Sequence, residues 1–111
     1  ITASVFPADT NQYTADAFIH LIQSYTIEKC DAFIAAHISS GMLERNGKER
    51  LHELFSMLHG DVNPDATFRA YSSGEKILII IPARDENARL KMTLSMSEHK
   101  LDRLSAEMEG I

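Results

Sequence analysis

The chain has 111 residues and a net charge of −5, and its hydrophobic fraction of 44% and charged fraction of 24% are ordinary for a globular protein. This length fits one domain with one hydrophobic core. The acidic balance argues against a nucleic-acid-binding protein, which would carry a basic patch, and no apolar run approaches the roughly 20 residues of a membrane-spanning helix.

The first half of the chain shows helical periodicity. Residues 1–11 are expected to form a flexible or extended lead-in, so the single domain is expected to cover 12–111. Apolar spacing predicts a first helix over 12–24 and a second over 27–39, with Thr26 as the N-cap of the second and Gly41 as its stop signal. The lone cysteine, Cys30, lies on the apolar stripe of the second helix and is expected in the core, with no intrachain disulfide.

A third helix is expected to begin at Asn46 and end near His59. Asn46 and Glu49 have the spacing of a capping box, in which each of the two side chains accepts a hydrogen bond from the backbone amide of the other residue. Met42 and Leu43 are expected to form a short apolar plug before this helix. The sequence therefore predicts three N-terminal helices.

The apolar period changes to that of strands at about Pro64. Four strands are predicted, over 66–71, 76–83, 88–97 and 100–108. The run 77–81 is apolar on both faces, which predicts a central strand covered on both sides, by helices or by a partner subunit. The strand over 88–97 alternates, with Leu90, Met92, Leu94 and Met96 pointing inward. Helices first and an antiparallel sheet second is the order of an α+β domain.

In this order, the elements resemble the NTF2-like (cystatin-like) superfamily, small cone-shaped domains whose helices pack into a curved antiparallel sheet of about four strands. The resemblance is carried by an Ala15–Ile22 helix, a second helix ending in Ser39-Ser40, Arg50 ahead of Leu54 and Phe55, the Leu58–Asp61 turn, the Tyr71–Lys76 hairpin, the Leu90–Leu94 strand and Lys100–Leu104. It is closest to the non-catalytic NTF2-like domains associated with periplasmic β-lactamase-related serine hydrolases.

The resemblance implies an accessory domain, or a stand-alone relative, of an exported protein, periplasmic or secreted; otherwise the chain is cytoplasmic. We expect no hydrolase domain and no Ser-x-x-Lys nucleophile motif in the chain. The implied partners are a second copy that meets the sheet face, an adjoining hydrolase domain or protein, and a small apolar ligand. The outer sheet face with Lys76, Arg89, Lys91 and Thr93 is the expected contact surface.

No catalytic constellation and no metal or cofactor motif stands out. His52 and His59 are seven residues apart, whereas chelation from a helix uses a spacing of four, so both are expected to be solvated or near a helix end. If the cone encloses a pocket, Tyr25, Asp31 and His37 are the first candidates to line it. Met92 and Met96 are further candidates, because methionine lines adaptable apolar pockets.

Three functions follow from these expectations. The first is a non-catalytic interaction or small-ligand-binding domain. The second is a small isomerase or dehydratase that uses Asp31, His37 or Tyr25 as an acid or base inside the cone, which requires a pocket and a shifted pKa. The third is a structural dimerisation domain whose interior is filled by Met and Phe.

Overall fold

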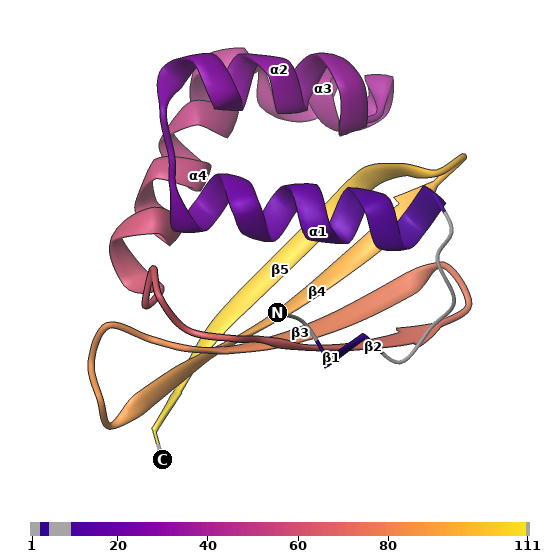
Figure 1. The fold of residues 1–111 in the computed structure, drawn as a ribbon. Helices are drawn as coiled ribbons and strands as arrows, with labels where there is room; N and C mark the ends of the chain where they lie inside the picture. Colours follow the sequence, from indigo (N-terminus) through magenta and orange to yellow (C-terminus); the bar gives the residue numbers. More distant parts are fainter. Residues whose placement is uncertain (1–2, 5–9, 111) are drawn as a thin grey trace.

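The computed structural model describes residues 3–4 and 10–110, and it is an α+β domain (Figure 1). The helices are α1 (Thr10–Gln23), α2 (Ile27–His37), α3 (Ser40–Asn46) and α4 (Lys48–Asp61). The strands are β1 (Ala3–Ser4), β2 (Arg69–Ser73), β3 (Lys76–Pro82), β4 (Ala88–Ser97) and β5 (Lys100–Gly110). Of the predicted lead-in over 1–11, the two residues of β1 pair with β2 and Thr10 opens α1, while 1–2 and 5–9 lie outside the described residues.

The prediction of three helices is wrong, because the described residues form four. Residues 40–46, predicted as a plug and a turn, form α3. The second helix ends earlier than predicted because Ile38 is extended and bridges Leu101 of β5, where the Ser39 amide donates to the Leu101 carbonyl at 2.9 Å. Gly41 therefore lies inside α3 and does not end α2. A tertiary contact with the last strand therefore ends the predicted helix early.

One of the two capping predictions is confirmed and the other is wrong. Thr26 caps α2 as predicted, since its hydroxyl accepts from the Lys29 amide at 3.1 Å. The predicted Asn46 capping box is wrong: α4 is preceded by Gly47 at a φ of 80°, and the Asn46 side chain donates to the Met42 carbonyl at 2.9 Å. The positive φ favours glycine and allows α3 and α4 to follow each other almost directly.

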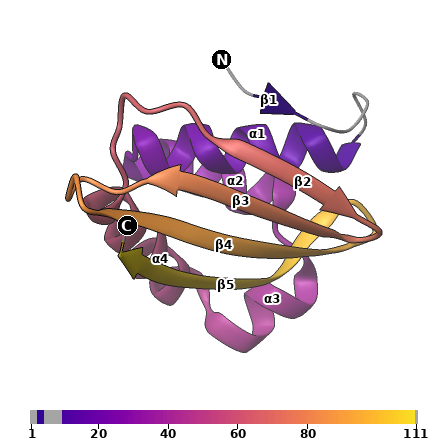
Figure 2. The ribbon, with the colours of Figure 1, turned by 90° about the horizontal axis from the view of Figure 1, so that it is seen from below.

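The helices form one layer and the strands form the other (Figure 1). The sheet order is β1-β2-β3-β4-β5, antiparallel from β2 to β5, with the short β1 parallel to β2. Seen from below in Figure 2, the strands lie in front of the helices, and no helix lies across this outer face. The strand over 88–97 has its predicted bounds. Strand β3 ends at Pro82, one residue before its predicted end, and proline cannot donate to a ladder.

Alternate strand residues point into the core. Ile77, Ile79 and Ile81 are fully buried between sheet and helices, whereas Leu78 and Ile80 point to the outer face and are half-buried. Within the described residues, the helices cover one face of β3, so the expectation that both faces are covered is met on that face alone. Leu90, Met92, Leu94 and Met96 are buried as predicted.

Candidate functional site

The space between helices and sheet is filled by side chains. Phe55 is fully buried and meets Phe18 and Phe33 edge-on, with ring centroids 6.0 and 5.7 Å apart. Met92 is fully buried and Met96 is 4% exposed in the same core. These two methionines, predicted as pocket candidates, thus serve as filling; Met96 also touches a small surface hollow beside the β4–β5 turn.

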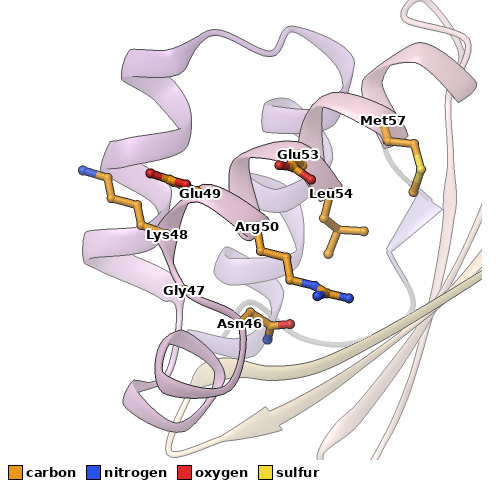
Figure 3. A pocket seen from close by; sticks show the side chains of 8 residues that line it. All are labelled: Asn46, Gly47, Lys48, Glu49, Arg50, Glu53, Leu54 and Met57. Carbon is orange, nitrogen blue, oxygen red and sulfur yellow. The ribbon is translucent and has the colours of Figure 1, made fainter.

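Instead, the larger hollows open on the surface of the described structure. One of about 910 Å³ lies along α4 and is lined by Asn46, Gly47, Lys48, Glu49, Arg50, Glu53, Leu54 and Met57. Figure 3 shows Arg50, Leu54 and Met57 extending to the side of the sheet, while Lys48 points the opposite way. The mixture of both charges with two apolar side chains provides no convergent set of polar groups for a small molecule.

Tyr25 and Asp31, two of the predicted candidates, are joined through a residue that the prediction set aside. The Tyr25 hydroxyl lies 2.9 Å from Nδ1 of His52, and Nε2 of His52 lies 2.8 Å from a carboxylate oxygen of Asp31. Lys48 forms an ion pair with the same carboxylate at 3.2 Å. His52 was predicted to be solvated or near a helix end; it lies near the start of α4, and its side chain is only 18% exposed. The spacing of 27 and 21 residues to its partners gives no sequence signal.

Electrostatics identify this cluster as a cross-link between α2, α4 and the connection before α2. The ionised carboxylate only accepts, so Nε2 of His52 carries the hydrogen and, in the neutral ring, Nδ1 accepts from Tyr25. Hydrogen bonds from His52 and Lys48 lower the pKa of Asp31. Burial raises the pKa of Tyr25, helped by Cys30 and Asp31. His52 thus bridges Asp31 and Tyr25 through its two ring nitrogens, and the cluster borders an open surface hollow of about 560 Å³.

Cys30 and His37 are held in the same helix layer. Burial raises the pKa of the Cys30 thiol to about 11, with Asp31 adding to the effect. His37 is half-buried, its Nδ1 lies 3.3 Å from the Thr14 hydroxyl, and burial followed by the charge of Lys100 lowers its pKa. His37 borders a shallow groove of about 300 Å³ between α1 and α2, at some remove from the Tyr25 cluster. The three acid–base candidates therefore do not converge on one site.

Two further expectations concern reactive groups. The expectation that no Ser-x-x-Lys spacing occurs is wrong, because Ser73 precedes Lys76 and Ser97 precedes Lys100 by three residues. Each pair faces across a two-residue hairpin turn and is exposed, so no buried lysine activates either serine. Among the residues described, no three His, Cys, Asp or Glu side chains are placed to hold a metal ion.

The outer face of the sheet is the remaining candidate. The register aligns Tyr71, Leu78 and Thr93 across β2, β3 and β4, and aligns Ile80 with Lys91. Tyr71 is 39% exposed, and Leu78 and Ile80 are half-buried by their neighbours alone. These residues form an apolar centre on a face that no helix covers (Figure 2).

Basic side chains surround this apolar centre. The outward positions of β2–β5 carry Arg69, Lys76, Arg89, Lys91 and Arg103 against two acids, Glu107 and Glu109. Arg89 pairs with Glu109 at 3.1 Å and Lys91 with Glu107 at 3.9 Å, whereas Arg69, Lys76 and Arg103 stand opposite neutral residues. Although the net charge of the chain is −5, these outward positions carry more basic than acidic side chains.

Comparisons with known proteins give information about the fold alone. No protein-family model matches the chain, and no curated protein matches it. The chain is similar to a de novo designed β-sheet protein solved by NMR in solution, with 12% sequence identity, a TM-score of 0.53, and coverage of 91% of this chain and 87% of that chain. This likeness concerns the backbone arrangement alone. No helix among the described residues is long and apolar enough to cross a membrane.

Proposed function

We propose that this domain is a non-catalytic interaction module that docks through the outer face of its sheet onto an acidic protein surface. The observation that carries the proposal is the apolar centre of Tyr71, Leu78 and Ile80, uncovered in the chain and ringed by basic side chains. An apolar and aromatic centre with a charged rim is the anatomy of a protein interface.

Two observations favour an acidic protein as the occupant. Three basic residues of the rim stand opposite neutral residues in the sheet, so their charge is open to a partner. Two copies meeting face to face would bring positive charge against positive charge, which complementary interfaces avoid. The centre contains two aliphatic residues and one aromatic residue, Tyr71, whereas single-stranded nucleic acid favours several stacking rings.

The filled interior supports this choice over a ligand-binding or isomerase-type function. A cone pocket needs free volume, and the aromatic and methionine side chains occupy the position where a ligand would bind. Within this proposal the chain is an accessory domain of the NTF2-like type, supported by the helices-then-sheet order and by the antiparallel β2–β5 sheet. Export of the protein belongs to the same proposal, and it rests on the resemblance alone.

Photo-crosslinking in cells tests the docking face. The photoreactive amino acid benzoylphenylalanine replaces Tyr71 in one variant and Tyr13 in the other, because both are tyrosines and Tyr13, on the helix layer, is the more exposed at 70% against 39%. We expect one discrete adduct with an acidic protein from position 71 and none from position 13. Changing Ile80 to Glu in the first variant should abolish the adduct, while changing Leu43, exposed on α3, to Glu should not.

The opposite results are equally clear. Equal adducts at both positions, or none at position 71, would contradict the proposal. An adduct of twice the chain's mass would identify a second copy as the occupant of the sheet face, and an adduct sensitive to nuclease would identify a nucleic acid.

A further inference from the structure

The last strand is an edge of the sheet, and only its beginning is covered. At Leu101, the Ile38 bridge and the Ser39 amide occupy the outer side of the strand, and the Arg45 guanidinium donates to the Asp102 carbonyl. The sheet order ends at β5, so in the described chain residues 103–110 have a strand neighbour on the β4 side alone. An edge of this length presents unpaired backbone groups to any other strand.

The inward row of this edge is also left exposed. Leu104 lies at the border of the core, Ala106 is exposed, and Met108 is 50% exposed. Their partners in β4, Leu94, Met92 and Leu90, are between 0% and 3% exposed. On α4, Met57 is 59% exposed beside Leu54, and both extend to the side of the sheet (Figure 3). The helix layer therefore leaves the inward side chains of Ala106 and Met108 exposed.

The outward row carries charges that select one register. Arg103 precedes Ser105, Glu107 and Glu109 on this side of the strand. In antiparallel self-pairing centred on Ala106, Arg103 of each chain faces Glu109 of the other. Centring on Glu107 sets two glutamates opposite each other, which is unfavourable. Centring on Ser105 requires the outer side of Asp102, which Arg45 already occupies.

We propose that two copies of this chain pair through β5, antiparallel and centred on Ala106, to form one continuous sheet. The inward row then places Leu104 of one copy against Met108 of the other, covering the exposed apolar groups. The outward row adds two intermolecular Arg103–Glu109 pairs to the existing Arg89–Glu109 pairs. The interface is isologous and closed, so it ends at two copies. This dimer engages Arg103 of the basic rim but leaves Tyr71, Leu78 and Ile80 open in both copies, so the docking function proposed above does not depend on it.

Light scattering after size exclusion, over a dilution series, measures the association of the whole chain. We expect a dimer for the wild type, and dissociation at least about tenfold easier for Ala106→Lys, which sets two like charges on the symmetry axis. Ala106 is exposed in the single chain, so the variant keeps its fold, as circular dichroism will verify. Ala35→Lys, an exposed alanine on α2, is the matched control and should remain dimeric.

A charge exchange tests the register. Arg103→Glu and Glu109→Arg should each weaken self-association at least about tenfold, because each sets like charges opposite each other twice. Mixed in equal amounts, the two variants should form a heterodimer of nearly wild-type affinity, because each changed side chain then faces an opposite charge. A wild type that is monomeric at every concentration, an Ala106→Lys chain that stays dimeric, or a mixture that stays monomeric would overturn the proposal.

Discussion

Truncation of Phe55 is the sharpest test of the filled interior. Phe55 is fully buried and meets two other rings, Phe18 and Phe33, edge-on. Replacing a buried phenylalanine with alanine costs about 3–5 kcal/mol, and each lost aromatic pair accounts for about 0.5–1.5 kcal/mol beyond burial. With two such pairs, Phe55→Ala should lower the free energy of unfolding by about 4–5 kcal/mol.

Thermal and urea unfolding measure this loss. A domain of this size loses about 4 °C of Tm per kcal/mol, so the midpoint should fall by about 15–20 °C. Met57→Ala, at a side chain that is 59% exposed, is the control and should change stability by less than about 0.5 kcal/mol. Phe55→Leu, which keeps part of the volume, should lose clearly less than Phe55→Ala.

Ligand rescue separates a filled interior from a hollow one. The alanine variant opens a dry apolar cavity, so saturating benzene should raise its Tm and leave the wild type unchanged. If benzene stabilises the wild type equally, or if Phe55→Ala costs less than about 1 kcal/mol, the interior already has free space. The argument for a surface function would then fail.

Three other predictions concern polar groups in the fold. Cys30 has a thiol pKa raised to about 11 by burial and is fully buried, so it should not react with Ellman's reagent at pH 8 until urea unfolds the chain; rapid native labelling would contradict this. Asp102 has a pKa lowered mainly by the Ser39 hydroxyl, at 2.6 Å, and then by Arg45. Because the native pKa is lower, the ionised carboxylate stabilises the fold above its ordinary pKa of 3.8, and this stabilisation is lost as pH falls through the native pKa. Asp102→Asn should therefore reduce Tm at pH 7 and make Tm depend less on acid pH. An equal loss of Tm at pH 2 would refute this reasoning. Tyr25→Phe removes the hydroxyl that donates to His52 and should lower the free energy of unfolding, measured in urea, by about 1 kcal/mol. The control is His59→Phe, in which NMR should show that the Asp31–His52 pair is intact.

Helix and strand periods explain which elements the sequence could predict. Strand β4 has its predicted bounds, because strict alternation and one buried face leave a single register. The second predicted helix ends early because Ile38 and Ser39 pair with Leu101, a contact that spans more than sixty residues and leaves no local signal. The Asn46 cap failed for a related reason, since Gly47 supplied the positive φ that separates two helices.

The residues of the candidate site were also predicted only in part. Tyr25 and Asp31 were predicted as candidates. His52, which hydrogen-bonds to both, comes from another helix, and only the packing of α2 against α4 places it between them. Met92 and Met96 were identified correctly as inward and apolar; whether such side chains line a space or fill it depends on the packing of the facing helices. Strand alternation predicted Lys76, Arg89 and Lys91 on the outer sheet face, whereas Arg69 and Arg103 are placed on that face by the register of the folded sheet.

By itself, the sequence determined the α+β order, the single core and the inward row of β4, because periodicity and turn residues act over a few positions. The tertiary structure decided the number of helices, the filling of the interior, the Tyr25–His52–Asp31 cross-link, and which faces and edges stay uncovered. These features depend on residues far apart in the chain, and their relative positions are set by packing between layers, which no local pattern encodes.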